Sequence, residues 1–168
     1  RDKVQLLTGF IWTPNTAAVA PMLTESKTPL IIMNAAASVL TTLSPYVVRA
    51  SMTLWQPSYQ LGKWAAKKHK RVYTMVMDMS PGHDAEQAFI KGFTEGGGQI
   101  ISSVRMPLKN PDFAAFMQRA KDIKPDAIFN WVTAGATSTA IMKAYNDLNV
   151  RQAGIPFISG SATNPKVT

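Results

Sequence analysis

Residues 71–93 read RVYTMVMDMSPGHDAEQAFIKGF, and this stretch decides the fold class. Its first part, Arg71–Asp78, is short, largely apolar and β-branched in places, which predicts a buried strand. Asp84 is followed three residues later by Gln87, a pattern that resembles a capping box, so we expect a helix over Asp84–Glu95. The glycines at 96–98 fit the end of that helix. A buried strand followed closely by a helix indicates an α/β fold.

The same alternation continues toward the carboxyl terminus. Pro111 fits the start of a helix and the pair Lys124-Pro125 fits the end of one. We expect strands over Gln99–Arg105, Asp126–Val132 and Ile155–Ser159, and helices over Asp112–Ile123 and Ala136–Asn149. Because helices separate consecutive strands, this region predicts a doubly wound parallel sheet that is covered on both faces.

The first third of the chain carries fewer elements. We expect strands over Val4–Phe10, Pro29–Met33 and Tyr46–Ala50, one helix from Pro14 to Lys27, and another from Pro57 to about His69. The segment Ala50–Gln56 has no turn glycine and is interpreted as a crossing between two lobes. The first lobe is then too short to be complete, so a face or an edge of its sheet must remain open.

Composition narrows the function classes. The 168 residues are 46% hydrophobic, which suits one or two globular domains and argues against disorder. Cysteine is absent, which excludes disulfides, thiolate metal sites and cysteine nucleophiles. No apolar run approaches the roughly 18–20 residues of a membrane span. Eighteen Lys and Arg against ten Asp and Glu give a net charge of +8, which leaves nucleic acid, an acidic membrane surface or an anionic ligand open.

The densest basic run is Lys67–Arg71, with the sequence KKHKR. It lies at the predicted end of a helix, where cations oppose the negative end of the helix dipole. The run has no interleaved aromatic residues, and the chain has no nucleic-acid motif and no second basic cluster. We therefore expect a solvated run and no nucleic-acid partner.

Ligands in open α/β sheets bind outside the carboxyl ends of the strands. The loops after the predicted strands are therefore the candidate site, and small, polar or glycine residues dominate them. Such residues allow backbone N–H groups to approach a small ligand, although they also suit tight turns. These loops are Ile11–Asn15, Asn34–Thr42, Met79–Asp84, Thr133–Thr137 and Ser159–Asn164.

Individual aromatic and titratable residues leave alternatives open. Trp12 is either a wall for a ligand or a lid on the core, whereas Trp64 and Trp131 are expected in the core and Trp55 in the crossing. His83 is either a base or ligand group, or a residue bonded to backbone where a helix begins. Asp78 ends a strand without an evident partner. No phosphate-binding loop, nucleophile elbow or metal-ligand spacing occurs, so we expect no enzyme, no metal and no cofactor.

The order of several segments resembles the periplasmic solute-binding proteins of ABC transporters, in the branch of the leucine/isoleucine/valine-binding proteins. The segments are PLIIMNAAAS (29–38), SPYVVRAS (44–51), residues 71–93, FAAFMQRAKDIKPDAIF (113–129) and IPFISGSATN (155–164). The resemblance implies two doubly wound lobes joined by hinge strands. It makes residues 1–50 the second half of the amino-terminal lobe, 51–56 the hinge crossover, and 57–168 most of the other lobe. The chain then resembles a fragment with an incomplete first lobe.

The resemblance also implies a ligand site. In the amino-acid binders of this family, lobe one holds the ligand carboxylate through loops that match Trp12, Thr13, Asn34, Ala35, Ala36 and Ser38. Lobe two adds aromatic residues at positions matching roughly Pro81 and either Ala134 or Gly135, and a carboxylate for the ligand ammonium at Ser161. Here the aromatic residues are absent and Ser161 is neutral, so an ammonium group would lack its counter-ion.

The resemblance therefore predicts a binding protein that captures a small organic acid between its lobes and delivers it to a membrane permease. An aromatic or branched carboxylate is favoured over an amino acid. The implied location is periplasmic, or lipid-anchored and extracytoplasmic. The alternative is a ligand-sensing regulatory protein on the same fold, and an upstream secretory signal would favour transport.

Overall fold

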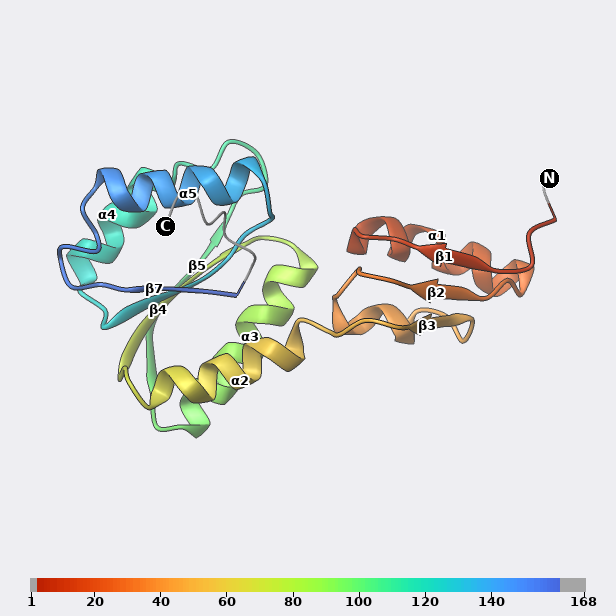
Figure 1. Cartoon of the computed structure of the whole chain (residues 1–168), viewed down its shortest axis with the longest axis horizontal. Coiled ribbons are helices and arrows are strands. Elements are labelled where there is room, and N and C mark those ends of the chain that lie inside the picture. Colours follow the sequence, from red (N-terminus) through yellow and green to blue (C-terminus); the bar gives the residue numbers. More distant parts are fainter. Residues whose placement is uncertain (1–2, 161–168) are drawn as a thin grey trace. The chain divides into compact units, whose positions relative to one another are not determined.

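The computed structural model describes residues 3–160, and the chain divides into two compact units, Arg1–Gln56 and Pro57–Thr168 (Figure 1). The assignment of residues 1–50 to half a lobe, 51–56 to a hinge and 57–168 to most of a second lobe stays a prediction. No described helix is long and apolar enough to cross a membrane.

Unit 1 is a small parallel sheet with helices packed against it. Its strands β1 (Leu7–Gly9), β2 (Leu30–Ile32) and β3 (Val47–Arg49) are ordered β1-β2-β3 and all parallel. Helix α1 (Thr13–Ser26) and the 3₁₀ helix η1 (Ser38–Thr42) complete it. All three strands are shorter than the sequence predicts, and η1 was expected as loop.

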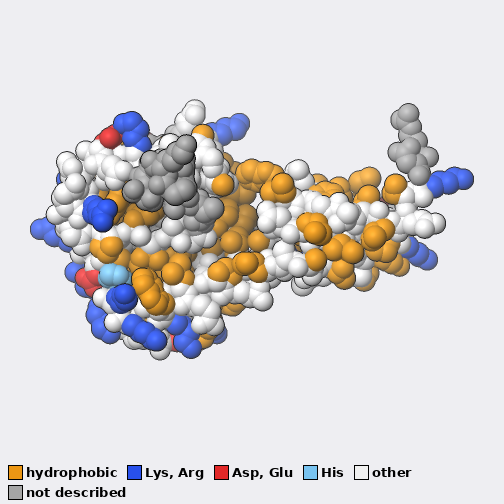
Figure 2. Space-filling view, in the orientation of Figure 1, with side chains coloured by type: hydrophobic (Ala, Val, Ile, Leu, Met, Phe, Trp, Pro, Cys, Tyr) orange, Lys and Arg blue, Asp and Glu red, His pale blue; other side chains and the backbone are white. Residues whose placement is uncertain are grey.

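One face of this sheet carries the core of unit 1. Leu30 and Val47 are register partners on that face, and they pack with Leu23 of α1 and Leu40 of η1. The alternate positions face the other way, and there Val48 is 54% exposed. Figure 2 shows hydrophobic side chains on the visible surface of this unit.

Unit 2 confirms the α/β pattern with a four-stranded parallel sheet of order β5-β4-β6-β7. The crossings in this order show that the chain winds in both directions from β4. Its elements are α2 (Trp55–Ala66, which begins two residues before the unit boundary), β4 (Arg71–Met77), α3 (Ser80–Glu95), β5 (Gln99–Met106), α4 (Phe113–Ile123), β6 (Ala127–Trp131), α5 (Ala136–Asp147) and β7 (Phe157–Ser159).

Helices α2 and α3 lie on one face of the sheet, and α4 and α5 lie on the other (Figure 1). Alternation along the strands explains the two layers, because successive side chains point to opposite faces. On one face Phe129 of β6 stacks on Phe89 of α3, with ring centroids 4.0 Å apart. On the other face Tyr73 is fully buried. Burial raises the pKa of its hydroxyl, and the positive charge of Arg119 on α4 opposes this shift in part.

Two local predictions in unit 2 were wrong. Helix α3 begins at Ser80 rather than at Asp84, because Pro81 suits the first turn of a helix, where no N–H bond is lost. Asp84 is therefore inside the helix and is not its cap. Trp64 was expected in the core but is 46% exposed, with the ammonium of Lys68 4.8 Å from its ring centre.

Candidate ligand-binding edges

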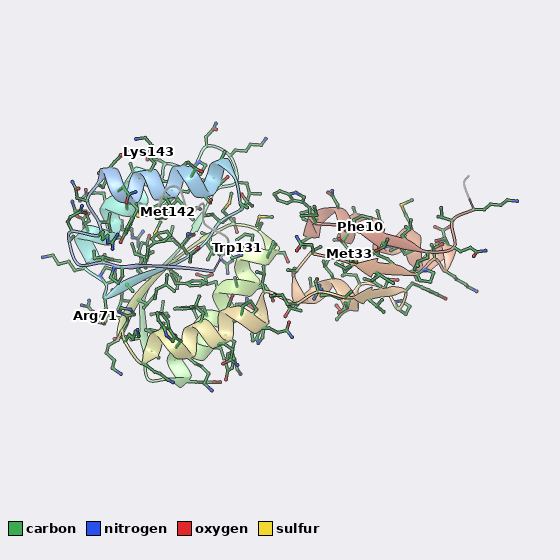
Figure 3. All side chains as sticks on the ribbon, in the orientation of Figure 1. Phe10, Met33, Arg71, Trp131, Met142 and Lys143 are labelled. Atoms are coloured by element: carbon green, nitrogen blue, oxygen red, sulfur yellow. The ribbon has the colours of Figure 1, made fainter. Side chains whose placement is uncertain are left out.

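The loops that follow β1 and β2 are joined at the carboxyl edge of the unit 1 sheet. The N–H of Met33 donates to the carbonyl of Gly9 over 2.8 Å, and the N–H of Ala35 donates to the carbonyl of Phe10 over 2.9 Å. Figure 3 labels Phe10 and Met33, one from each loop. Phe10 has a φ of 62°, so the chain turns sharply directly after β1. Two loops far apart in sequence thus form one local structure.

The residues predicted to hold a carboxylate belong to these loops and differ in exposure. Trp12 precedes α1 at its N-cap position and is 49% exposed, while Thr13 begins the helix and is buried. Asn34 and Ser38 are exposed, Ala35 is buried and Ala36 is half-buried. The structure therefore places all six at the carboxyl edge of unit 1, with Trp12, Asn34 and Ser38 the accessible ones. Their binding role stays a prediction.

Sequence reasoning missed Arg49 at this edge. Arg49 is the last residue of β3, and its guanidinium donates from Nη2 to the carbonyl of Ala37, inside the loop that follows β2. The side chain is half-buried. The signal was available, because a charged residue at the carboxyl end of a parallel strand belongs to the edge where ligands bind. Residues 1–56 contain two acids, Asp2 and Glu25, and neither is in the edge loops.

The corresponding edge of unit 2 holds the other predicted residues. Ala134 and Gly135 are exposed, and Gly135 has a φ of 88° immediately before α5, a conformation that favours glycine. The neighbouring loop after β7 is tied in by the N–H of Gly160, which donates to the carbonyl of Asn130 over 2.8 Å. Pro81 was expected in a loop but is buried in the first turn of α3. Ser161 lies outside the described residues.

Asp78 and His83 form a polar pair at the same edge of unit 2. Asp78 follows β4 directly, and its N–H donates to the carbonyl of Met106 at the end of β5. His83 is in the first turn of α3, and its Nε2 lies 2.7 Å from Oδ1 of Asp78. The side chains of His83 and Asp78 are 30% and 57% exposed. Asp78 therefore has a partner that was not evident from the sequence, because the turn brings His83, five positions on, back to the strand end.

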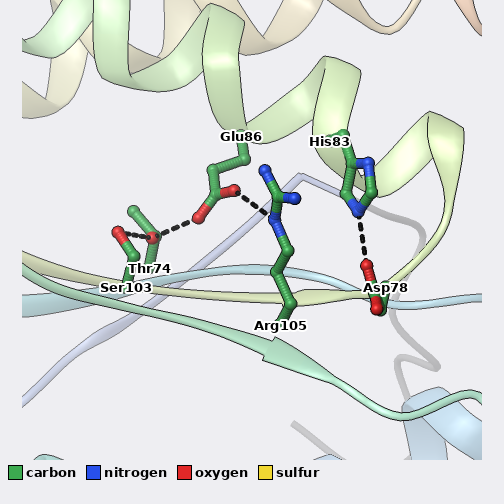
Figure 4. A network of polar contacts seen from close by, with 6 residues as sticks. All are labelled: Thr74, Asp78, His83, Glu86, Ser103 and Arg105. Atoms are coloured by element: carbon green, nitrogen blue, oxygen red, sulfur yellow. Dashed lines mark hydrogen bonds and ion pairs between the residues drawn. The ribbon is translucent and has the colours of Figure 1, made fainter.

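A second polar group lies deeper, between α3 and the sheet (Figure 4). Glu86 is 4% exposed, and the hydroxyl of Thr74 donates to its Oε1 over 2.7 Å. Ser103 Oγ lies 2.8 Å from Thr74 Oγ1, and Arg105 Nε lies 3.6 Å from Glu86 Oε2. A buried carboxylate needs such partners, so this group ties α3 to β4 and β5. It holds the second turn of α3, which carries Glu86, against the sheet.

Within residues 3–160, no group of three side chains is arranged to hold a metal ion. The edges described above offer backbone N–H groups, hydroxyls, one guanidinium and one His–Asp pair. Groups of these kinds are suited to bind a small polar molecule by hydrogen bonding and charge.

The family follows from comparison with known proteins. Residues 1–168 match the family model described as periplasmic binding protein. The chain belongs to this family. It is 42% identical over 165 residues to the Leu/Ile/Val-binding protein homolog 6 of Brucella melitensis, a match that covers 97% of this chain and 42% of that protein. Homologues of the same name in Brucella abortus and Brucella suis are equally similar. The chain thus spans less than half the length of the curated relatives it matches.

Solved structures of periplasmic binding proteins agree with this assignment. A solute-binding protein of an ABC transporter from Rhodopseudomonas palustris BisB5, in complex with 3,4-dihydroxy benzoic acid, is 46% identical with a TM-score of 0.88. Another from R. palustris, in complex with 4-hydroxybenzoate, is 44% identical with a TM-score of 0.89. The matches cover 94% and 95% of this chain and 44% of each structure. The predicted family, fold class and partial coverage are confirmed.

Proposed function

We propose that this periplasmic binding protein is the extracytoplasmic solute-binding component of an ABC transporter and that it captures an aromatic carboxylate. The protein delivers this ligand to a membrane permease, with no chemical step. The family and the relatives support the transport role. The finer statement, that the ligand is an aromatic acid rather than an amino acid, depends on the charges at the two edges.

The observation that carries the ligand class is the charge at the unit 1 edge. Arg49 enters the loop that follows β2, and no acid lies in either edge loop. Backbone N–H groups and a guanidinium in a partly desolvated corner favour an anion. Trp12, exposed beside this corner, supplies an aromatic surface of the kind that packs against a ring.

An amino acid would need a second charged contact. In the family, a carboxylate on the loop that matches Ser159–Ala162 holds the ligand ammonium, and this chain has Ser161 there. An ammonium buried without its counter-ion is disfavoured by several kcal/mol. The positions matching Pro81, Ala134 and Gly135 lack the aromatic side chains of the amino-acid binders. These positions of unit 2 therefore favour a ligand without an ammonium group.

Calorimetry on the intact protein tests this proposal. We expect benzoate and hydroxybenzoates to bind, and leucine, isoleucine and valine to give no measurable heat. Arg49→Gln should weaken benzoate binding at least tenfold, since hydrogen bonds to charged groups contribute about 1.5–3 kcal/mol. Arg151→Gln, which removes an exposed positive charge from unit 2, is the matched control and should leave affinity unchanged. Micromolar binding of any of the three amino acids would contradict the proposed ligand class.

A further inference from the structure

The Asp78–His83 pair is a built polar contact that the proposed function does not use. Its two residues come from different elements, the end of β4 and the first turn of α3 (Figure 4). Asp78 is held at its backbone by Met106, and His83 N–H donates to the carbonyl of Met79 over 3.0 Å. These bonds hold the two backbones, the side chains contact each other, and both side chains are accessible at the carboxyl edge of unit 2.

The geometry leaves specific hydrogen-bonding capacity. The imidazole engages Oδ1 of Asp78 through Nε2, so Oδ2 of Asp78 and Nδ1 of His83 are the atoms to which a ligand can bond. When Nε2–H donates to Asp78, both of these atoms are acceptors in the neutral imidazole and the carboxylate, so they match the single hydrogen that a phenolic hydroxyl donates. We propose that Asp78 and His83 recognise a ring hydroxyl of the ligand. This inference rests on the proposed function and narrows its ligand to hydroxy-substituted aromatic acids.

The same pair is a poor counter-ion for an ammonium group. Asp78 is 57% exposed, so its charge is screened by water, and the imidazole shares it. A buried ammonium needs a carboxylate that is desolvated with it. A neutral hydroxyl loses less on leaving water and gains a charge-assisted hydrogen bond to the carboxylate. The two structures at 44% and 46% identity hold 4-hydroxybenzoate and 3,4-dihydroxy benzoic acid, which carry such hydroxyls.

The test compares benzoate with 4-hydroxybenzoate by calorimetry on the intact protein. Asp78→Ala should weaken 4-hydroxybenzoate binding about 3- to 10-fold and change benzoate binding less than about twofold, because the exposed carboxylate contributes about as much as an ordinary hydrogen bond. Asp147→Ala is the matched control, because Asp147 is also 57% exposed and is paired with Lys143 on α5, where we propose no ligand contact. On the ligand side, 4-methoxybenzoate lacks the donor hydrogen, and wild-type protein should bind it more weakly than 4-hydroxybenzoate.

The outcomes separate this inference from the proposed function. If wild-type protein binds neither aromatic acid, the proposed function fails and this inference fails with it. If both acids bind, but Asp78→Ala weakens them equally or not at all, this inference alone is overturned. Should the variant unfold, stronger wild-type binding of 4-methoxybenzoate than of 4-hydroxybenzoate would overturn it as well. Leucine binding that Asp78→Ala abolishes would instead make Asp78 an ammonium site, and it would contradict both proposals.

Discussion

Helices α2 and α3 cross where each has a glycine, and this contact gives a quantitative prediction. Gly62 of α2 is buried against the backbone of Phe89 and Phe93 of α3. A Cβ at position 62 would lie 2.8 Å from the Phe93 nitrogen and closer still to the Phe89 carbonyl oxygen. Neither atom belongs to a flexible side chain, so the helices must separate to admit a methyl group. The perturbation is Gly62→Ala.

Two opposing effects decide the sign. Alanine favours the helix over glycine by about 1 kcal/mol at an interior position. Overpacking a close contact costs about 1–3 kcal/mol, and contact with rigid backbone places this site at the upper end of that range. Separating the helices also weakens the surrounding van der Waals contacts, which fall off steeply with distance. We therefore expect a net loss of about 2 kcal/mol, or about 8 °C in melting temperature for a unit of this size.

Thermal and urea unfolding followed by circular dichroism measures this loss. Gln60→Ala is the control, since Gln60 is an exposed interior residue of the same helix, where alanine should be neutral or slightly stabilising. Gly92→Ala should resemble Gly62→Ala, because its Cβ would lie 3.1 Å from the Tyr59 carbonyl carbon and 3.2 Å from the Lys63 nitrogen. A Gly62→Ala protein as stable as wild type would refute the close crossing of α2 and α3.

Two further predictions concern unit 2. Asp126 accepts the N–H groups of Lys70 and Arg71 over 2.7 and 2.9 Å, and these bonds, the Lys70 bond foremost, lower the pKa of its carboxyl. The carboxylate of Asp126 therefore stabilises the folded state at every pH above about 3.8, the pKa of this group in the unfolded chain. This stabilisation is lost as the pH falls through the lower pKa of the folded state. Urea unfolding at pH 7 should show that Asp126→Asn is less stable than wild type by about 1 kcal/mol. This difference should shrink below pH 4. A difference that stays constant with pH would contradict the role assigned to the Asp126 carboxylate. The buried hydroxyl of Tyr145 donates to the carbonyl of Ile155 over 2.8 Å. Tyr145→Phe removes this bond and should lower the free energy of unfolding by about 1 kcal/mol. An unchanged urea midpoint would argue against the bond.

The sequence predicted the order and type of the regular elements because its signals are local. Apolar runs such as Arg71–Asp78, the glycines at 96–98 and Asp112, whose side chain caps α4 at Ala115, each act over a few residues. The start of α3 was missed because two local signals compete. The capping-box pattern favours Asp84, while Pro81 favours an earlier start, and the structure follows Pro81.

The candidate site was less predictable, because its contacts join residues that are distant in sequence. The hydrogen bond from Arg49 to Ala37 spans twelve positions and depends on β2 and β3 being neighbours. The Asp78–His83 pair depends on the tight turn between β4 and α3. Strand ends could be recognised, but not which side chains meet there. The prediction for Trp64 failed for a different reason. An aromatic residue on an amphipathic helix suggests burial, but Trp64 is exposed and lies beside Lys68.

The uneven covering of the unit 1 sheet follows from the same physics. Parallel sheets are normally buried on both faces, because their connections place helices on each side. Here α1 and η1 both pack on the face that carries Leu30 and Val47, while Val48 on the opposite face is more than half exposed. Both β1 and β3 are edge strands of the described sheet. A sheet of this kind gains stability when its second face is covered. At the carboxyl edge, by contrast, the loops after β1 and β2 already bond to each other through Gly9, Phe10, Met33 and Ala35.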